Sequence, residues 1–468
     1  IRQIAHKIID FLAQIEDFQK KLWLKKKFVV ETNYCITLDR IPDEFYPEIA
    51  ANDAQREEWV RLFAIDEIKR NGKLFKVSYS NPLSVEFLKA NLFLVLDTKF
   101  FDQEFKYKVL ASIEVIDKSL NGLLLQSENF QALRFLSETY RKHMKSIYID
   151  PPYNTDASAI LYKNNYKDSS WTSLMENRLQ IAHSLLRDEG IICVAIDDEE
   201  VLPLRYLLTS VFGNQLGIVP VRSNPAGRKT KGRLAPTHEY ALFYGKSPKS
   251  IPGSIPKRKK ALARYPHQDA KGRFAWANFI RSGNNDKRED RPKLYYPIFV
   301  SEEDRIRIPQ LMWNDEKNEY FIQEKPNKNE MVIFPIVESE NGEKIEKNWQ
   351  RGYVRVPTEL DEYRVRREEN GKVNIDFKTR MDEGAPPKTW WDYNLYASAN
   401  YGPAELKNLF GEKIFDYAKS ELLVEDCLRT SGLSKNNCSV IDFFAGSGTT
   451  GHAVINLNRT DGGNRKYL

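Results

Sequence analysis

One short segment of the sequence combines a carboxylate, two prolines and an aromatic ring. Asp150-Pro151-Pro152-Tyr153 directly follows residues 146–149 (SIYI), an apolar run typical of a buried strand. A carboxylate and a neighbouring backbone carbonyl, both held by prolines, can accept the two hydrogens of an amine. The Tyr153 ring can stack on the planar group that carries the amine. The segment is a candidate catalytic site, with a rigid turn after a strand as the alternative on these residues alone.

A second segment, residues 442–451 (DFFAGSGTTG), lies between a strand-like run and a helical pattern that begins at His452. Gly446 and Gly448 let the backbone turn tightly and approach a ligand closely, and the helix start offers free N–H groups. The turn differs from a dinucleotide site, because Asp442 ends the strand and two phenylalanines follow it. An acidic residue at this point suits a ligand that carries a positive charge or an ammonium group.

Alternating strands and helices must position both segments. Amphipathic helical patterns separate short apolar runs that lack polar alternation. These runs are 123–125, 146–149, 191–196, 217–221, 240–244 and 439–442. The pattern predicts an α/β fold with a mostly parallel sheet covered by helices on both faces. Ligands of such sheets bind at the carboxyl ends of the strands, where both segments lie.

The chain divides into four regions of different character. Residues 1–91 are predicted to form a helical N-terminal segment, because apolar residues recur there at helical spacing. The α/β pattern is expected over 92–221 and again over 392–468. Residues 222–391 are rich in Arg, Lys, Pro, Gly and aromatic residues, with weak periodicity and many turn signals. They predict an irregular inserted domain.

Charge is distributed unevenly along the chain. The net charge is +6, but residues 222–293 alone hold 19 Lys and Arg against 5 Asp and Glu, so the rest is negative. Such a segment favours a polyanionic partner, although acidic substrates and membrane surfaces stay open on charge alone. Four cysteines without metal spacing indicate a reducing, cytoplasmic setting, with Cys193 buried in a strand. No apolar run approaches the roughly 20 residues of a membrane span.

Both candidate segments are typical of one known family. Residues 150–155 (DPPYNT) and 442–451 (DFFAGSGTTG) resemble the catalytic and cofactor motifs of amino-methyltransferases that act on DNA. Their order and the insertion between them are similar to the β class, especially the modification (Mod) subunits of type III restriction–modification systems. The resemblance covers residues 92–468. It implies a Rossmann-like sheet that binds S-adenosylmethionine (SAM) and a site that methylates adenine N6 of a base flipped out of double-stranded DNA.

The resemblance also implies roles for individual residues. The catalytic residues are Asp150, Pro151, Pro152 and Tyr153. The cofactor-binding residues are Asp442, Phe443, Phe444, Ala445, Gly446, Ser447, Gly448 and Thr449, with Lys419 and Ser420 at the methionine end and Glu128 and Asn129 near the adenine. Target recognition falls in the basic insertion, where the candidate DNA contacts are Arg222, Arg228, Lys229, Lys231, Arg233, Lys257, Arg258, Lys259 and Lys260. No metal site is expected.

Partners and alternatives complete the hypothesis. The resemblance allows a nuclease subunit and a second copy of the chain as partners, and it implies an acidic residue after the strand that begins at Lys466, where the printed sequence stops. Asp before Pro-Pro-Tyr favours adenine, with cytosine N4, RNA or a protein amide as alternative substrates. A recognition subunit without catalysis is the non-enzyme alternative. His238 and His452 are expected to be structural, and Trp390 and Trp391 to pack.

Overall fold

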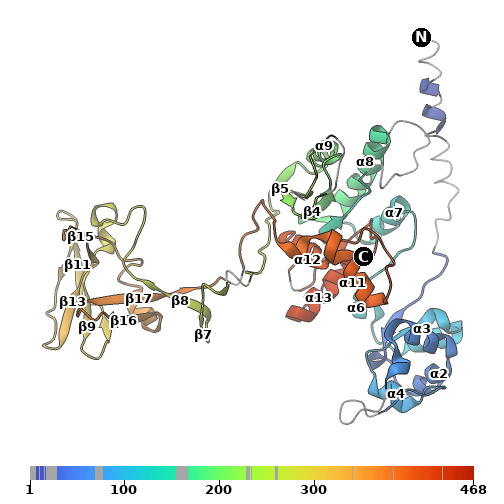
Figure 1. Ribbon diagram of the computed structural model, residues 1–468, viewed down its shortest axis with the longest axis horizontal. Coiled ribbons are helices and arrows are strands. Elements are labelled where there is room, and N and C mark those ends of the chain that lie inside the picture. Colours follow the sequence, from blue (N-terminus) through green and yellow to red (C-terminus); the bar gives the residue numbers. More distant parts are fainter. Residues whose placement is uncertain are drawn as a thin grey trace. The chain divides into compact units, whose positions relative to one another are not determined.

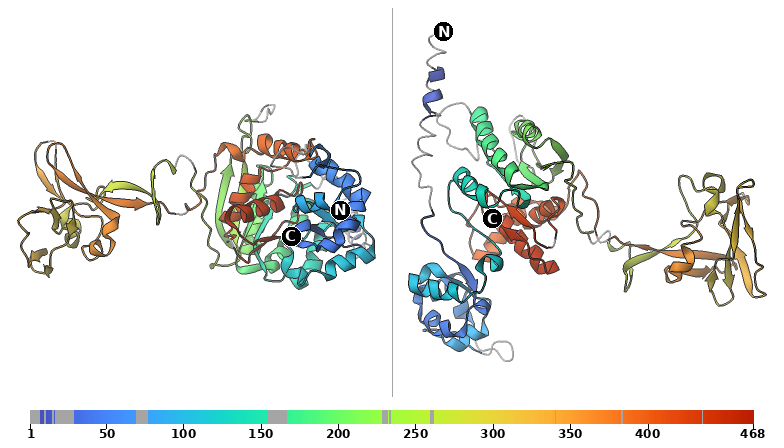
Figure 2. Two further views of the ribbon diagram at one scale, coloured as in Figure 1. Left: turned by 90° about the horizontal axis from the view of Figure 1, so that it is seen from below. Right: turned by 180° about the vertical axis from the view of Figure 1, so that it is seen from behind.

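The computed structural model describes residues 7–9, 11–14, 16, 29–68, 77–153, 167–227, 232, 234–258, 262–339, 341–382, 384–434 and 436–468. It contains two compact units (Figures 1 and 2). Unit 1 comprises Ile1–Ile255 and Pro386–Leu468, and unit 2 comprises Pro256–Ala385. Within the described residues, no helix is both long enough and apolar enough to cross a membrane.

Unit 1 holds the elements that carry both candidate segments. Its α-helices and β-strands are β1 (Cys35–Thr37), α2 (Tyr46–Ala51), α3 (Asp53–Phe63), α4 (Val85–Ala90), β2 (Val95–Asp97), α5 (Gln103–Ala111), α6 (Ile116–Ser119), α7 (Asn129–Thr139), β3 (Met144–Ile149), α8 (Lys167–Leu185), β4 (Leu186–Ile196), α9 (Val201–Phe212), β5 (Asn214–Val221), β6 (Glu239–Gly245), α11 (Ser398–Phe410), α12 (Glu421–Thr430), β18 (Ser439–Ile441), α13 (Thr449–Asp461) and β19 (Lys466–Tyr467).

The central sheet of unit 1 has six strands in the order β19-β18-β3-β4-β6-β5. The first four run parallel, whereas β6 is antiparallel to both β4 and β5. The prediction of a mostly parallel sheet is therefore confirmed, with one reversed strand. This reversal places the beginning of β6 at the same edge of the sheet as the ends of β3, β4 and β18.

Each face of the sheet has its own apolar core. Alternate residues of a strand point to opposite faces, so Ile192 of β4 belongs to one core and Cys193 to the other. Helices α7, α8 and α9 cover the first face, and α12 and α13 cover the second (Figure 1). Cys193 is fully buried, as predicted. Coverage of both faces explains why these strands lack polar alternation.

The N-terminal part of unit 1 differs from the prediction in its extent. Helix α3 lies within the segment predicted to be helical, but the apolar residues 92–96, where the α/β pattern is expected to begin, do not enter the central sheet. Residues 95 and 96 belong to β2, which pairs antiparallel with β1. The core of this N-terminal part includes Trp59 and Phe87, and it extends to Val109. The boundary predicted at residue 92 is therefore wrong, because a short apolar run does not reveal which strand will pair with it.

Two further expectations are corrected within unit 1. Residues 123–125 form no strand, although Gly122 bridges Tyr467 and the Leu123 N–H donates to the Tyr467 carbonyl at the sheet edge. The inserted unit is also shorter than predicted. Residues 222–255 and 386–391 belong to unit 1, because β6 lies inside the central sheet and Trp391 bridges Val221.

Unit 2 is a β-structure rather than an irregular insertion. Its strands are β7 (His267–Asp269), β8 (Gly272–Asn278), β9 (Ile298–Ser301), β10 (Ile306–Arg307), β11 (Leu311–Asn314), β12 (Glu319–Ile322), β13 (Glu330–Ile333), β14 (Ile336–Glu338), β15 (Lys344–Glu346), β16 (Tyr363–Arg367) and β17 (Val373–Arg380). Its core contains fully buried Phe279, Tyr296 and Trp349. Most of these strands are too short to show a clear alternation in the sequence.

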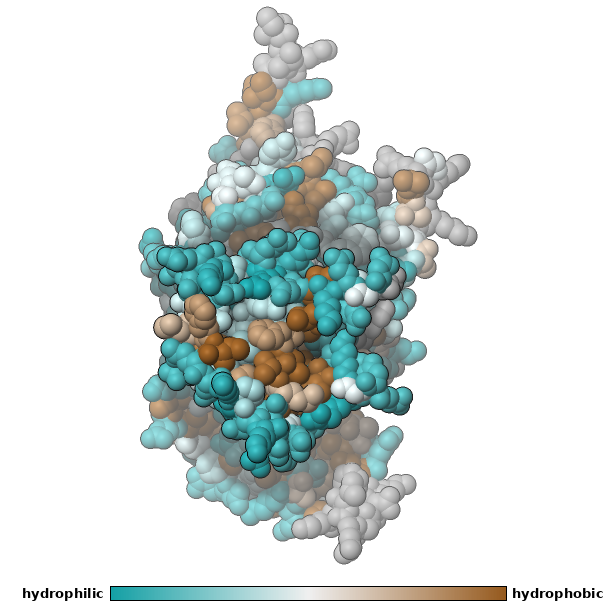
Figure 3. Space-filling model, turned by 90° about the vertical axis from the view of Figure 1, so that its left-hand side faces the viewer, coloured by the Kyte–Doolittle hydropathy of each residue, from teal (hydrophilic) through white to brown (hydrophobic). Residues whose placement is uncertain are grey.

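One face of unit 2 presents apolar side chains at its centre, surrounded by polar ones (Figure 3). The exposed apolar residues of β11, β12 and β13 are Met312, Phe321, Ile322, Met331 and Val332. Strands β11 and β12 form a two-stranded sheet and β13 is an edge strand of another sheet, and these side chains stay exposed among the described residues. An uncovered apolar area of this kind is typical of a surface that contacts another molecule.

Gly402 holds α11 against the segment that leads into α12. A Cβ at Gly402 would lie 1.9 Å from the Ala418 carbonyl oxygen, a contact that real structures do not contain. The close approach therefore depends on glycine, and it sets the position of the neighbouring Lys419.

We expect Gly402→Ala to destabilise unit 1 by about 1 to 3 kcal/mol through overpacking. The sign of this stability change is informative, because replacing glycine by alanine within a helix ordinarily stabilises it by about 1 kcal/mol. Gly217→Ala is the control, since its Cβ would meet no atom within 4 Å. Urea unfolding of both variants measures the difference. Equal stability of the two variants would contradict the close packing at Gly402.

Candidate active site

The two candidate segments meet at one edge of the central sheet. Strands β18 and β3 are parallel neighbours, with Ile441 opposite Ile147. Asp442 and Asp150 follow the ends of these strands, so both carboxylates lie at the carboxyl edge. The two groups are close enough for the charge of Asp150 to raise the pKa of Asp442. The tertiary structure thus joins residues that are far apart in the sequence.

Trp171 holds the two prolines of the first segment in place. This residue of α8 is fully buried, and its indole Nε1 donates to the Pro152 carbonyl at 2.8 Å. Among the described residues, no donor reaches the Pro151 carbonyl. The segment therefore offers one satisfied carbonyl and one open acceptor. The open acceptor belongs to the residue next to Asp150.

Four side chains at this edge form what we call the Lys419 cluster: Asp150, Tyr153, Glu239 and Lys419. The Lys419 ammonium lies 2.8 Å from Glu239 Oε2 and 3.2 Å from Asp150 Oδ1, and it also donates to the Tyr153 hydroxyl. The Tyr153 hydroxyl donates to Glu239 Oε2 at 3.1 Å. Asp150 Oδ1 is buried but accepts no directed hydrogen bond. Apart from its ion pair with Lys419, this oxygen has no hydrogen-bond donor among the described residues, so it is a second candidate acceptor beside the Pro151 carbonyl.

Burial and charge act against each other in this cluster. Burial raises the pKa of the Asp150 carboxyl above its ordinary value, although the nearby Lys419 ammonium lowers it. Burial by itself would lower the pKa of Lys419, but the Asp150 and Glu239 carboxylates outweigh it and raise that pKa. Burial also raises the pKa of Tyr153 well above its ordinary value. The ammonium and the neutral phenol are therefore the stable forms of these groups.

The second segment forms a turn that Asp442 organises. We call residues 442–450 the glycine turn. Asp442 Oδ1 accepts the Phe444 N–H at 2.9 Å, and Oδ2 accepts the Thr450 hydroxyl at 2.6 Å. Gly446 and Gly448 have φ values of +53° and +78°, which favour glycine. The carboxylate therefore holds the turn together rather than pointing both oxygens at a ligand. Burial raises its pKa to about 7.

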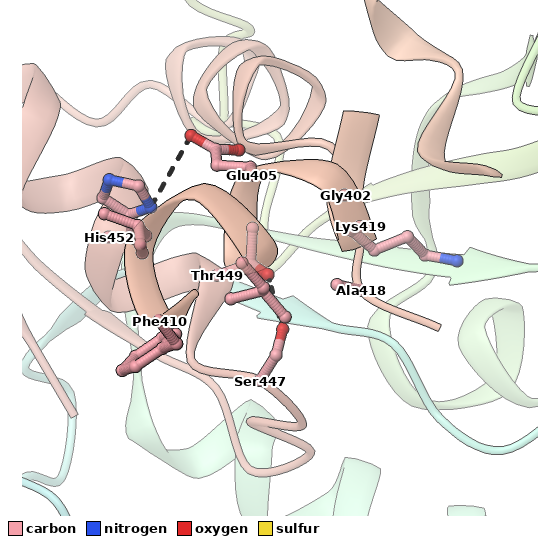
Figure 4. A pocket seen from close by; sticks show the side chains of 10 residues that line it. Gly402, Glu405, Phe410, Ala418, Lys419, Ser447, Thr449 and His452 are labelled. Carbon is pink, nitrogen blue, oxygen red and sulfur yellow. Dashed lines mark hydrogen bonds and ion pairs between the residues drawn. The ribbon is translucent and has the colours of Figure 1, made fainter. Parts of the chain in front are cut away.

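A small cavity opens beside the glycine turn (Figure 4). Its volume is about 130 Å³, and its lining residues include Glu405, Ser447, Thr449, His452 and the stem of Lys419. The Lys419 ammonium points away from the cavity, and His452 faces Glu405 at 3.9 Å (Figure 4). A Cβ at Gly448 would meet no atom within 4 Å, so the backbone there is open to a ligand.

Glu128 and Asn129 lie beside the glycine turn but are held by Arg178. Arg178 is a buried residue of α8 whose guanidinium contacts Glu128 Oε1 at 2.6 Å and Asn129 Oδ1 at 2.5 Å. Asn129 Nδ2 donates to the Phe443 carbonyl at 3.2 Å, and Glu128 caps α7. These contacts link α7 and α8 to the turn. They place both residues next to the predicted cofactor motif.

Ser420 and Trp391 are anchoring residues. The buried Ser420 hydroxyl donates to the Leu395 carbonyl at 2.6 Å, so it fixes the start of α12 and does not face the cavity. Its predicted role at the cofactor is corrected accordingly. Trp391 is buried against Phe243 and Tyr396, as predicted for a packing residue, whereas Trp390 is 62% exposed.

The predicted DNA contacts fall into three groups. Arg228, Lys229, Lys231, Arg233, Lys259 and Lys260 lie outside the described residues. Arg222 is half-buried, and its N–H donates to the Trp391 carbonyl. Lys257 is only 14% exposed, lies 3.8 Å from Asp382 and sits over the Tyr265 ring. The expectation that Lys257 reaches solvent as a phosphate contact is therefore corrected, while Arg258 is half-buried.

The basic segment has acidic partners elsewhere in unit 2. Lys271 pairs with Asp361 and Glu362, and Arg288 pairs with Glu319 and Glu346. These acids lie later in the chain than residue 293. A count along the sequence therefore overstates how much positive charge this segment presents to a partner.

Three residues at the site were missed by the sequence analysis of roles: Trp171, Arg178 and Glu239. Glu239 had a signal, since an acidic residue directly precedes the buried run 240–244. Arg178 lies four residues after Leu174 and three before Ile181, on the inward face of an amphipathic helix. The sequence does not show which side chains Glu239 and Arg178 pair with, because their partners are distant along the chain. Among the described residues, no group of three or more metal-ligating side chains occurs.

Comparison with known proteins shows where the chain is similar to others. The sequence profile of a family described as DNA methylase matches residues 144–463, which is more than half of the chain. The EcoPI Mod subunit of a type III restriction-modification enzyme from Escherichia phage P1 is 29% identical over 391 residues. That alignment covers 75% of this chain and 57% of the relative. The chain thus spans little more than half the length of this relative.

The chain is also similar to a second sequence relative and to a solved structure. The type II methyltransferase M.KpnI of Klebsiella pneumoniae is 29% identical over 377 residues, which cover 78% of this chain and 84% of the relative. A solved structure, a putative DNA modification methylase from Thermus thermophilus, has 12% sequence identity and a TM-score of 0.32. That comparison covers 73% of this chain and 85% of the solved one.

The pKa of Asp442 leads to a prediction about stability. Its ordinary value is 3.8 and its value in the fold is about 7, so the folded state binds more protons between these pH values. The contribution of Asp442 to the free energy of unfolding therefore falls as pH rises through this range. Asparagine does not titrate, so Asp442→Asn should gain stability relative to the wild type as pH rises from about 5 to about 8. Thermal unfolding at several pH values measures this, and a difference independent of pH would contradict the raised pKa.

Proposed function

The chain belongs to the DNA methylase family whose profile matches residues 144–463, and we propose that it transfers a methyl group from SAM to adenine N6 in DNA. The observation that carries the proposal is the pair of open acceptors at the carboxyl edge. Asp150 Oδ1 is buried without a directed hydrogen bond, and the Pro151 carbonyl has no donor among the described residues. An exocyclic amine supplies the two hydrogens that this pair lacks.

The acceptor pair activates the amine without covalent chemistry. Hydrogen bonds from the amine to Asp150 and Pro151 draw the nitrogen lone pair out of conjugation with the ring, so that its electron density stays on nitrogen. Both acceptors are held in advance, by the prolines and by Trp171, so little reorganisation is needed. Tyr153 supplies an aromatic ring beside the acceptors on which a flipped base can stack.

The residues beside the glycine turn fit SAM. The open backbone at Gly448 admits close approach of a ligand, and the cavity combines the Ser447 and Thr449 hydroxyls with the Glu405 carboxylate. This set suits an amino-acid head, because a carboxylate can bind the N-terminus of α13 and an ammonium can face Glu405. A cavity of about 130 Å³ holds one end of such a ligand, not all of it. When bound, SAM supplies an electrophilic methyl group on a sulfonium.

Adenine is the proposed target because an aspartate precedes Pro-Pro-Tyr. The runner-up is cytosine N4, whose exocyclic amine presents the same two hydrogens to the same acceptors. The names of the relatives, Mod subunits and a type II methyltransferase, support a role in restriction–modification. We infer that unit 2 and the segment before it recognise the DNA target and that a nuclease subunit is a partner.

We expect Asp150→Ala to lower the rate of methyl transfer on the order of 10²- to 10³-fold, the usual effect of losing one preorganised polar interaction. Affinity for SAM should change little, since Asp150 faces the amine rather than the cavity. The assay uses tritiated SAM with unmethylated genomic DNA, and calorimetry reports SAM binding. Asp188→Ala, at a half-exposed carboxylate, is the control.

Digestion of the labelled DNA to nucleosides identifies the product. N6-methyladenine supports the proposal in full, and N4-methylcytosine would replace the proposed base by the runner-up. Near-normal transfer by Asp150→Ala would refute the mechanism. SAM binding without any transfer by the wild type would favour a recognition subunit without catalysis.

Salt dependence tests the DNA contacts. Replacing Arg228, Lys229, Lys231 and Arg233 by Gln should flatten the plot of log affinity against log salt by about 0.9 for each phosphate that is no longer neutralised. Lys257→Gln should leave the slope unchanged, because Lys257 already pairs with Asp382 and releases no counterion. Titrations with target and scrambled duplexes measure both slopes. A slope that falls with Lys257→Gln but not with the fourfold variant would place the phosphate path elsewhere.

A further inference from the structure

Glu239 is a buried carboxylate at the active-site edge to which neither motif assigns a role. It is the first residue of β6, and the reversed direction of this strand brings it to the ends of β3 and β18. Its side chain is 9% exposed. Oε2 accepts from both Lys419 and Tyr153, whereas the buried Oε1 has no hydrogen-bond partner. Burying a carboxylate costs free energy of folding unless an opposite charge and hydrogen bonds compensate for the lost water.

Glu239, Lys419 and Tyr153 form a closed ring of hydrogen bonds. The ammonium donates to the carboxylate and to the phenol oxygen, and the phenol donates to the same carboxylate oxygen. Each member of the ring therefore restrains the other two. Through this ring Glu239 fixes the direction of the Tyr153 hydroxyl and the position of the Lys419 ammonium.

We propose that Glu239 is a positioning residue for methyl transfer, which draws the Lys419 ammonium toward itself so that Asp150 only shares it, and which fixes Tyr153 for the target base. This inference rests on the proposed function. The distances carry the argument: the ammonium lies 2.8 Å from Glu239 Oε2 but 3.2 Å from Asp150 Oδ1. Glu239 is the closer carboxylate and accepts a hydrogen bond from Lys419, whereas Asp150 Oδ1 has the ion pair with Lys419 but no directed hydrogen bond. That oxygen stays available to the amine.

The charge of the Lys419 cluster supports the same role. With both carboxylates ionised and Lys419 protonated, the cluster carries a net charge of −1 in a site that is largely withdrawn from water. The target nitrogen gains positive charge as it forms its bond to the methyl group. A site with an excess negative charge stabilises that change more than it stabilises the neutral amine. If Glu239 lost its charge, Asp150 would be the single counter-charge of Lys419 in the cluster.

The test is Glu239→Gln, which keeps the size and an oxygen acceptor but removes the charge. Asp150 would then be the single carboxylate paired with Lys419, so the ammonium should approach Asp150 Oδ1 more closely and compete with the amine for this acceptor. We expect kcat to fall on the order of 10- to 100-fold, with the affinities for SAM and for DNA changed little. Glu425→Gln is the matched control, because Glu425 is also a largely buried carboxylate, paired with Arg429 at 3.3 Å outside the site.

A second variant separates positioning from a structural role. Adding Lys419→Met to Glu239→Gln removes the ammonium that competes for Asp150, so the double variant should be faster than Glu239→Gln alone. The recovery should be larger at high pH. Burial raises the pKa of Asp150 and Lys419 lowers it, so loss of Lys419 moves that pKa upward and ionisation then needs a higher pH.

Other titratable groups facing the cluster do not produce this pattern. They are Tyr148, Cys427 and Asp442, to which Tyr153 of the cluster itself is added. Burial raises the pKa of the two tyrosines and of Cys427 well above their ordinary values, so they stay neutral near pH 8. Asp442 titrates in both the single and the double variant, so it cancels from their comparison.

Rates are measured at saturating SAM on unmethylated genomic DNA, with SAM and DNA affinities measured separately. Wild-type kcat in Glu239→Gln would overturn the proposal, as would a double variant no faster than the single one. Loss of SAM binding in Glu239→Gln would show a structural role and would also overturn it. A wild type that binds SAM and DNA but transfers no methyl group would refute the proposed function instead.

Discussion

The active-site edge depends on one ammonium shared between two carboxylates. Asp150 and Glu239 approach the same largely buried region, where two negative charges without a cation would be unfavourable. Lys419 lies within 3.2 Å of one and 2.8 Å of the other, and its own pKa is raised as a result. Burial raises the pKa of Asp150 and the Lys419 ammonium lowers it, while one of its oxygens keeps no directed hydrogen bond.

That interaction depends in turn on the order and direction of the strands. Parallel β18 and β3 place Asp442 and Asp150 side by side, and the reversed β6 delivers Glu239 to the same edge. Lys419 arrives from the segment before α12, against which α11 packs through Gly402. The glycine turn is held from within by Asp442 and from α7 by Asn129. Each of these parts is held by contacts within the fold itself.

In unit 2, the folded structure reduces the positive charge that the basic segment presents at its surface. The basic stretch that stands out along the chain is partly neutralised by acids from later in the chain, such as Glu346 and Asp382. What remains for a polyanion is a smaller set of cations. The same unit carries an uncovered apolar area on β11–β13, so its surface is not uniformly cationic. Its contacts with partners therefore need not be electrostatic throughout.

The sequence alone determined the sheet class, the strands that carry both segments, and the residues Asp150, Tyr153, Gly446 and Gly448, because turn chemistry and apolar runs are local properties. It could not determine that the run near Leu96 pairs with β1, since strand pairing depends on distant residues. It also could not assign Glu239, Arg178 or the direction of the Lys419 side chain. Each of these depends on contacts between residues 49 to 269 positions apart, which only the folded chain brings within hydrogen-bonding distance.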